Sequence, residues 1–205
     1  MRKSIKILGV LAIAACFAFA VPYGKESRKI KVVIDAGHGG HDYGATLNAL
    51  SEKEITDRIA GKIKAMNTDG EVEIYLTRPS DTYISLNDRI EAINEIKPDL
   101  VLSLHLNSTK NTEVSGMEFF VSNSSARYEQ SADYARKLAA KFEQKSYSVR
   151  GVKEANFLLL RKADVPAVNF QIGFLSNEND RKYITDEDKQ NEIATLVVDF
   201  LEEIK

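Results

Sequence analysis

Two histidines and a glutamate lie at the ends of apolar or amphipathic segments, where together they could hold a divalent metal ion. His38 follows an apolar run and is flanked by glycines, which leave room for a ligand to approach the backbone. His105 comes near the end of a second apolar run, and Glu52 lies in the first turn of an expected helix. Catalytic zinc sites use three such protein ligands and keep a fourth position open for water. The sequence therefore indicates a zinc site formed by His38, Glu52 and His105.

Each of these residues also has a purely structural interpretation. A lone histidine such as His38 is more often structural than functional, and His105 is equally consistent with a buried, hydrogen-bonded side chain. Glu52 would stabilise the start of a helix through the helix dipole without any metal. His41, in the same glycine-rich loop as His38, is interpreted as an exposed loop residue. The combination of three suitable residues favours the metal site more than any one of them does.

Two polar residues close to the candidate ligands in sequence are expected to support them. Asp35, three residues before His38, would either orient the His38 ring or cap the backbone of the turn that follows. Asn107, two residues after His105, is likewise placed among the residues around the ligands. Both assignments require that the strand before His38 and the strand that carries His105 end close together in the fold.

The segments that must position these residues alternate between strand and helix patterns. Ser51 and Glu54 form a capping-box sequence at the start of the first helix, and Pro98 stops the second. Apolar residues recur at helical spacing in the helices, whereas the strands are short apolar or alternating runs. The expected strands are 31–35, 72–77, 100–106, 116–121, 157–160 and 167–172, and the expected helices are 51–66, 86–96, 128–142 and 193–204.

This order predicts an α/β fold, a three-layer α/β/α sandwich around a mostly parallel sheet of about six strands. The strand that begins at Leu100 is apolar on both faces, as is typical of an interior strand covered by helices. Ligands of such sheets bind beyond the carboxyl ends of the strands. His38, His105 and Gln171 each follow or close a strand, so we expect them to meet at that edge.

The first twenty residues are typical of a secretory signal peptide. A basic segment precedes a fifteen-residue apolar run from Ile7 to Val21, which is short for a membrane span, and Ala18-Phe19-Ala20 offers a cleavage site. Cys16 lies in a lipobox-like sequence, which makes a lipid anchor the less favoured alternative. We divide the chain into a signal peptide (1–20), a short linker (21–30) and one catalytic domain (31–205), exported to the periplasm, the cell envelope or the outside.

Charge and cysteine content exclude some classes of function. Three of the 28 basic residues lie in the first twenty, so 25 basic and 30 acidic side chains remain in residues 21–205. This negative balance argues against nucleic acid as a partner, which would require a basic surface. Cys16 is the single cysteine, so the domain has neither a disulfide framework nor a catalytic thiol.

Motifs spread along the whole domain occur in the order and spacing of one known family. They are 32–40 with Asp42 and Gly44-Ala45, Glu52-Lys53, Thr77-Arg78-Pro79 with Asp81, Leu86 and Arg89, 103–107, 116–118, 150–153, 166–168 and 172–177. The chain resembles the zinc-dependent N-acetylmuramoyl-L-alanine amidases, of the class whose zinc ligands are His, Glu and His.

The resemblance implies that one zinc ion is held by His38, Glu52 and His105. It also implies cleavage of the amide that joins the lactyl group of N-acetylmuramic acid to L-alanine of the stem peptide in peptidoglycan. Zinc would polarise the carbonyl and lower the pKa of its bound water to about 7. In the family a second glutamate, immediately before Ile-Gly-Phe-Leu-Ser-Asn, takes the proton from water and passes it to the leaving amine.

At the position of that glutamate this chain has Gln171. Glutamine has a similar shape, but it cannot accept and return a proton at neutral pH. Losing a general acid/base costs about 10²–10⁴ in rate. Glu118, within a strand, and Glu178, beyond the last strand, offer no obvious replacement. The sequence is compatible with a natural glutamine and with an engineered one that traps substrate.

Three hypotheses follow. The first is a secreted zinc amidase of peptidoglycan with reduced turnover, and the second is a catalytically weak or inactive module that binds peptidoglycan or regulates a partner. The third is a zinc hydrolase of another amide.

Peptidoglycan is the expected partner, an activator protein is a further candidate, and the chain is expected to be a monomer. The segment after strand 116–121 has room for one helix of about twenty residues, so we expect an open site without a built-in plug.

Overall fold

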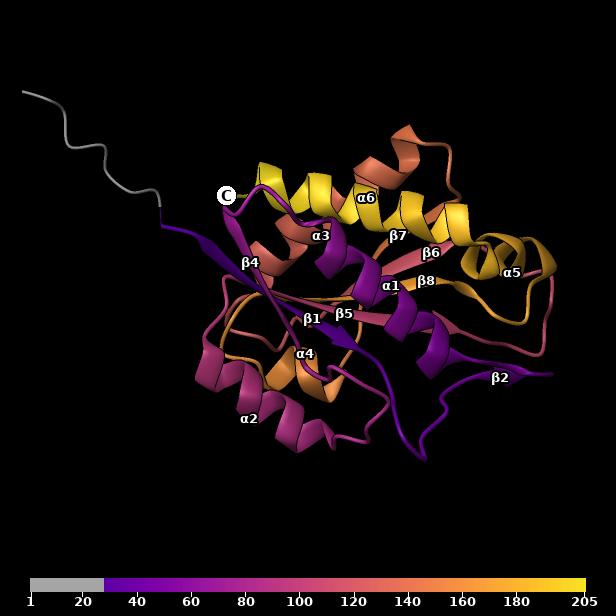
Figure 1. Cartoon of the computed structure of the whole chain (residues 1–205), viewed down its shortest axis with the longest axis horizontal. Coiled ribbons are helices and arrows are strands. Elements are labelled where there is room, and N and C mark those ends of the chain that lie inside the picture. Colours follow the sequence, from indigo (N-terminus) through magenta and orange to yellow (C-terminus); the bar gives the residue numbers. More distant parts are fainter. Residues whose placement is uncertain (1–27) are drawn as a thin grey trace, which may run out of the picture.

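A six-stranded sheet forms the middle layer of the structure, a computed structural model that describes residues 28–205 (Figure 1). The expected signal peptide, Cys16 and most of the expected linker lie outside the described residues. Within this part of the chain, no helix is long and apolar enough to cross a membrane.

The order of the strands places the carboxyl ends of four of them along one edge. Strands β4, β1, β5 and β8 are parallel neighbours, whereas β6 pairs antiparallel with β8, and β7 pairs parallel with β6. A separate hairpin joins β2 to β3 in the loop after β1. The strands in sheet order are β4 (Val72–Leu76), β1 (Ile30–Ala36), β5 (Leu100–Asn107), β8 (Ala167–Phe174), β6 (Met117–Val121) and β7 (Val149–Glu154), and the hairpin strands are β2 (Thr46–Leu47) and β3 (Leu50–Ser51).

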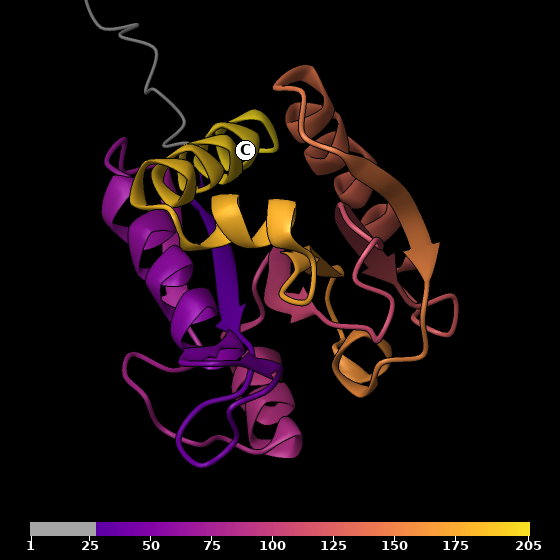
Figure 2. The ribbon, with the colours of Figure 1, turned by 90° about the vertical axis from the view of Figure 1, so that its right-hand side faces the viewer.

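Helices cover both faces of the sheet, and the larger hydrophobic core lies on the side that carries four of them (Figure 1). In this core Phe119 and Phe170 stack with ring centroids 4.5 Å apart. The C-terminal helix packs against the helix that follows β3, as Figure 2 also shows. One face carries α1 (Glu52–Met66), α3 (Tyr128–Gln144), α5 (Glu178–Thr185) and α6 (Glu187–Glu203), and the other carries α2 (Leu86–Ile96) and α4 (Leu158–Lys162).

The predicted three-layer α/β/α fold with a mostly parallel six-stranded sheet is confirmed, but one predicted strand is wrong. Residues 157–160 begin the short helix α4, because Leu159 and Leu160 pack with Ala163 against the sheet at near-helical spacing. The fifth strand in chain order is instead β7, an edge strand. A short apolar run does not by itself distinguish a strand from a buried helical turn.

The expected capping box is also wrong in its contacts. Ser51 is the N-cap residue of α1, but its side chain makes no capping hydrogen bond, and its buried Oγ has no partner within residues 28–205. The start of α1 is held instead by backbone bonds, in which the Glu52 N–H donates to the Ala45 carbonyl. These bonds tie the helix to the loop after β1, which carries His38.

Candidate metal centre

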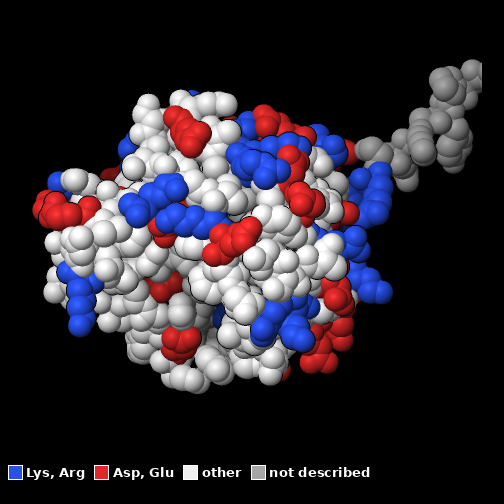
Figure 3. Space-filling view, turned by 180° about the vertical axis from the view of Figure 1, so that it is seen from behind, with Lys and Arg blue, Asp and Glu red and all other residues white. Residues whose placement is uncertain are grey.

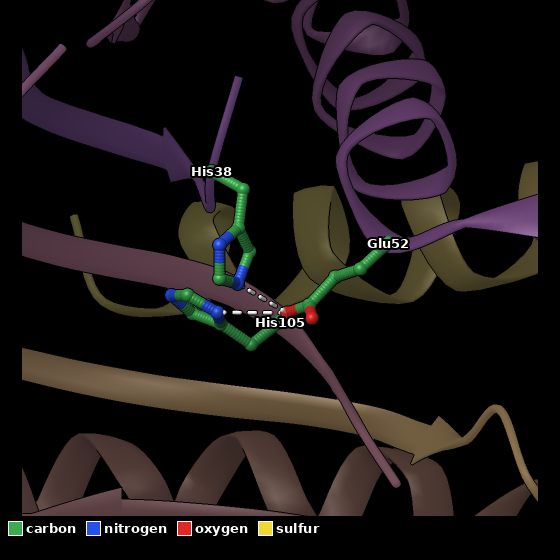
Figure 4. Close-up of side chains that lie close together, drawn as sticks. All are labelled: His38, Glu52 and His105. Carbon is green, nitrogen blue, oxygen red and sulfur yellow. Dashed lines mark hydrogen bonds and ion pairs between the residues drawn. The ribbon is translucent and has the colours of Figure 1, made fainter. Parts of the chain in front are cut away.

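Side chains from three separate elements converge at the carboxyl edge of the sheet (Figure 4). Oε1 of Glu52 lies 3.1 Å from Nε2 of His38 and 2.9 Å from Nδ1 of His105. One ligand atom from each residue lies within 4.8 Å of the other two. His38 comes from the loop after β1, Glu52 from the start of α1, and His105 from β5. The structure thus brings together the three residues that the sequence indicated.

The carboxylate of Glu52 is held from two sides. Its side chain is 4% exposed, and the backbone N–H groups of Ala45 and Leu106 donate to Oε2 at 2.8 Å and to Oε1 at 2.9 Å. A carboxylate that accepts two backbone hydrogen bonds keeps its position without help from a cation. The start of α1 and the end of β5 are therefore joined through Glu52.

His38 is oriented by Asp42, four residues further along the loop. Nδ1 of His38 and Oδ2 of Asp42 are 2.9 Å apart, while Oδ1 of Asp42 accepts a hydrogen bond from the Gly44 N–H. His38 also has a left-handed backbone, with φ of 60°. Metal-binding histidines commonly donate their second N–H to a carboxylate, which fixes the ring and its tautomer. Asp42 thus has the role that we expected of Asp35.

Asp35 is instead buried beneath the loop after β1, and it supports that loop through Arg89. Its carboxylate accepts hydrogen bonds from Arg89 at 2.6 Å, Ser103 at 2.7 Å and Thr77 at 2.7 Å. Burial disfavours the charged carboxylate, but the Arg89 guanidinium and the two hydroxyls hold the pKa of Asp35 below its usual range. Arg89 also donates to the carbonyl oxygen of His38 at 2.5 Å. Asp35 therefore acts on His38 only through Arg89.

Arg78 forms a second buried support for the same loop. Its side chain has no exposed surface, and its guanidinium donates to the carbonyl oxygens of Ala36, Gly37 and Lys53. It also pairs with Asp57 at 2.7 Å. The fixed fork of an arginine can satisfy several acceptors at once, which suits it to hold two chain segments together.

Two glycines leave the space in which the ligands meet. A Cβ atom on Gly37 would lie 2.4 Å from the His105 ring. One on Gly44 would lie 2.6 Å from both the Glu52 carboxylate and the His38 ring, and Gly44 has a φ of 66°. A side chain at either position would thus displace the ligands.

This donor set suits a zinc ion. Two imidazole nitrogens and a carboxylate oxygen are common zinc ligands, and atoms bound tetrahedrally at about 2.0 Å lie about 3.3 Å apart, close to the spacings here. Burial lowers the pKa of His38, but the hydrogen bonds that its ring donates to the Glu52 and Asp42 carboxylates, together with their negative charges, outweigh it and raise the value to about 9. Despite its burial, the pKa of Glu52 is held well below its usual range by His105 and His38. The cluster favours a positive charge between its members, where a cation would bind.

A cleft of about 510 Å³ opens beside the three ligands on the α2 and α4 face of the sheet. Gln171 lies at its floor and is the neighbour of His105 in the pairing of β5 with β8. Nε2 of Gln171 donates to Oδ1 of Asn169 at 3.0 Å, and its buried Oε1 has no partner among the described residues. The rest of the lining is mainly aromatic and aliphatic. It includes Tyr83, Ile84, Leu86, Phe157, Leu158, Leu159 and Leu160.

The other candidate residues lie farther from the ligands. Asn107 donates to Glu118 at 3.0 Å, and has no hydrogen bond to a candidate ligand. His41 is exposed, as expected, and its ring lies 4.2 Å from that of Tyr83. Glu118 is the neighbour of Gln171 on β6, but Lys153 and Arg150 hold its pKa below the usual range in spite of its burial, which makes it a poor base. Glu178 is exposed on α5.

Asp42, Arg78 and Arg89 support the metal-binding loop but were not predicted to do so, although each lies in one of the family-like motifs. Asp42 lies four residues after His38 in the sequence, and the two side chains meet only because the loop between them is tight. Arg78 and Arg89 are the cations that hold this loop from below. The signal for Arg89 was Asp35 itself, because a carboxylate at the end of an apolar strand requires a buried partner.

Comparisons with known proteins agree with this picture. The family model described as N-acetylmuramoyl-L-alanine amidase matches residues 32–203. The sporulation-specific N-acetylmuramoyl-L-alanine amidase of Bacillus subtilis (strain 168) is 36% identical over 74% of this chain and 58% of its own length. The chain spans about three fifths of the length of the first curated relatives it matches.

Solved structures of similar proteins have the same fold. The N-acetylmuramoyl-L-alanine amidase from Clostridium difficile 630 aligns with a TM-score of 0.80 and 30% identity, over 86% of this chain and 97% of that one. The CwlD amidase from Clostridioides difficile, solved in complex with the GerS lipoprotein, aligns with a TM-score of 0.78 and 25% identity, over 85% of this chain and 98% of that one. The expected family and fold are confirmed.

Proposed function

The chain belongs to the N-acetylmuramoyl-L-alanine amidase family, and on this basis we propose that it is a zinc amidase of peptidoglycan. The bond cleaved is the amide between N-acetylmuramic acid and L-alanine of the stem peptide. The observation that carries the proposal is the convergence of His38, Glu52 and His105 beside an open cleft. His38, Glu52 and His105 would hold the ion, with Asp42 fixing the His38 ring.

Zinc bound by three protein ligands supplies a Lewis acid and lowers the pKa of water bound in the fourth position. The chain's own residues provide the rest of the chemistry. The cleft is open to solvent, and its largely aromatic and aliphatic lining offers few polar groups that would hold water around the reacting amide. The unpartnered Oε1 of Gln171 can accept a hydrogen bond from a substrate N–H, but Gln171 moves no proton at neutral pH. We therefore expect slow turnover.

A second function is favoured by the same glutamine. If proton transfer is too slow to matter, the protein would bind peptidoglycan, or regulate a partner, through an intact metal centre. The hydrogen bond between Gln171 and Asn169 supports this alternative, because two neutral amides form the floor of the cleft where a base would be needed.

The two functions are separated by an assay with purified protein, peptidoglycan sacculi and zinc. Release by the native chain of stem peptides with a free L-alanine N-terminus supports the amidase and excludes a module that only binds. Release by Gln171→Glu alone supports the binding module. His105→Ala is the control, since it removes a ligand. If metal analysis finds no zinc bound to the native chain, both functions are contradicted.

Export and partners are also part of the proposal. We retain the division into a signal peptide (1–20), a linker (21–30) and one domain (31–205), which places the protein in the periplasm, the cell envelope or outside the cell. Acidic and basic side chains are interspersed on the face drawn in Figure 3, which suits a partner other than nucleic acid. The solved complex of CwlD with a lipoprotein makes an activator protein a reasonable partner to test.

A further inference from the structure

A second cluster of charged side chains lies on the same face of the sheet as the metal centre. Glu118 of β6 is buried, and its Oε1 accepts hydrogen bonds from Nε of Arg150 at 2.7 Å and Nζ of Lys153 at 2.5 Å. Its Oε2 accepts one from Asn107 at 3.0 Å. One carboxylate thus faces two cations, and the cluster has an excess of one positive charge.

A β-bulge at Gly151 brings both cations to this face. Met117 and Phe119 are two residues apart on β6, but their partners on β7 are three residues apart. Gly151 has a φ of 94°, which glycine adopts without strain. In a regular strand, side chains at positions 150 and 153 would point to opposite faces of the sheet. The extra residue turns Arg150 and Lys153 to the same side, as bulges near functional sites often do.

The cluster continues a row of residues that begins at the metal centre. His105 is the neighbour of Gln171, and Gln171 is the neighbour of Glu118 on the next strand. Adjacent strands lie about 4.8 Å apart, so Glu118 is about 10 Å from His105 along the sheet. The backbone of β7 lies one strand further, but the charged ends of Arg150 and Lys153 reach back to Glu118. An extended peptide covers about 3.3–3.6 Å per residue. The two residues that follow an amide bound at the metal centre therefore cover about 7 Å of this distance, and the carboxylate of the second one and the long side chains of Arg150 and Lys153 would span the remainder.

The two cations are less completely paired than the buried arginines that support the metal loop. In Arg78 and Arg89 all three guanidinium nitrogens donate hydrogen bonds, and both side chains are at most 3% exposed. Arg150 and Lys153 are each 39% exposed, and Nη2 of Arg150 has no partner among the described residues. These hydrogen-bond donors of Arg150 and Lys153 are therefore available to a ligand. If the cluster had only a structural role, one cation would be enough to neutralise Glu118.

We propose that Arg150 and Lys153 bind a carboxylate of the stem peptide, carried by the residue that follows L-alanine. This inference rests on the proposed function and adds the substrate feature that the site selects. In peptidoglycan that residue is a D-glutamate with a free carboxylate or its amide, D-isoglutamine. The pair distinguishes these two forms, because a carboxylate accepts charge-assisted hydrogen bonds from both cations and a neutral amide does not. Glu118 holds the two cations in place.

The test is a calorimetric titration of the full chain, with zinc added, against muramyl-L-alanyl-D-glutamate and muramyl-L-alanyl-D-isoglutamine. The acid is expected to bind about tenfold more tightly than the amide. Lys153→Gln, which leaves Arg150 paired with Glu118, should remove most of this difference and leave binding of the amide unchanged. Lys137→Gln is the matched control, because this lysine pairs with Asp133 on α3, on the opposite face of the sheet.

A second variant separates binding from support. Glu118→Gln removes the negative charge that the two cations share, so it should tighten binding of the acid by several-fold, whereas a structural role predicts no gain. Equal binding of the two peptides, or no response to Lys153→Gln, overturns the inference. The same holds if neither peptide binds. The release of stem peptides from sacculi decides separately on the proposed function.

Discussion

The β1 side of the cleft and its β8 side differ in how firmly their polar groups are held. On the β1 side, two backbone N–H groups fix Glu52, and Asp42 fixes the ring of His38. On the β8 side, Nε2 of Gln171 donates to Oδ1 of Asn169, and Oε1 of Gln171 has no partner in the part of the chain that the structure describes. The polar side chains on the β1 side are thus fixed by several hydrogen bonds each, whereas, within that part of the chain, those on the β8 side are bound only to each other.

This difference separates two properties that usually occur together in a hydrolase. The groups that would bind the metal come from the loop after β1, the start of α1 and β5, whereas position 171, where a proton would be moved, lies on β8. A change on β8 can therefore slow turnover while the metal centre stays intact. We conclude that binding of metal and ligand should survive where catalysis is weak.

The largest effect is expected from restoring a carboxylate on the β8 side. Gln171→Glu should raise the rate of amide cleavage by about 10²–10⁴, the usual contribution of a general acid/base. The rate of peptide release from sacculi measures this. Asn169→Asp is the matched control, since it puts a carboxylate on the same strand opposite Ser103 rather than His105, and should give no gain. An equal gain from both variants would contradict a specific role for position 171.

The next largest effect is expected beneath the β1 side. Asp35→Asn leaves the Arg89 guanidinium buried without its counter-ion, which should lower the free energy of unfolding by about 3–5 kcal/mol. Urea unfolding followed by circular dichroism measures the loss. Asp133→Asn breaks a solvent-exposed pair with Lys137 and should change the free energy of unfolding very little. Similar losses in the two variants would show that the buried pair is not a special support.

A smaller effect is expected from the carboxylate behind His38. Asp42→Ala should weaken zinc binding by about 10–100-fold, because the ring loses the group that fixes its orientation. Competition with a chromogenic chelator measures the zinc affinity. Asp81→Ala, which removes a carboxylate bonded to Lys53 and Gly40 but not to His38, should leave it unchanged. Unchanged affinity in Asp42→Ala would remove Asp42 from the metal centre.

The smallest effect is a pH dependence of folding stability that comes from Asp35. Its pKa is lower in the folded protein than in the unfolded chain, so its contribution is complete above the unfolded value of 3.8 and is lost as the pH falls through the folded value. Between the unfolded and the folded pKa of Asp35, the difference in free energy of unfolding between the native chain and Asp35→Asn should shrink by up to about 1.4 kcal/mol for each pH unit of acidification. Urea midpoints between pH 3 and 7 test this, and a constant difference would contradict the lowered pKa.

Most of the fold could be predicted because periodicity reports burial. The strand at Leu100 and the helix that starts at Glu52 were predicted to within a residue or two. The helix α5, the hairpin of β2 and β3 and the first turns of α6 were not predicted. Two further regions were missed because their periodicity is weak. The run that begins at Phe157 is apolar throughout and therefore fits a strand and a helical turn equally well. In β7 the bulge at Gly151 breaks the alternation by which a strand is found.

The candidate ligands could be predicted because residue type and position at a strand end are both visible in the sequence. The contacts that orient them were not, since they depend on loop geometry. The left-handed backbone of His38 turns its ring toward Asp42 rather than toward Asp35, and nothing in the spacing specifies that turn. Likewise, the pairing of Glu118 with Gln171 depends on β6 running antiparallel to β8.

Gly37 has a consequence for protein engineering and for comparing related sequences. Its φ lies outside the left-handed region, so an alanine fits its backbone, but the added methyl group would collide with the ring of His105. We therefore expect Gly37→Ala to fold and to retain every ligand side chain, but with the ring of His105 displaced from its place beside Glu52. In a living cell, this variant would show which effects of the protein come from binding to the cell wall and which require the metal ion. In any relative, a larger residue just before the first histidine would indicate a lost metal centre even where all three ligands remain.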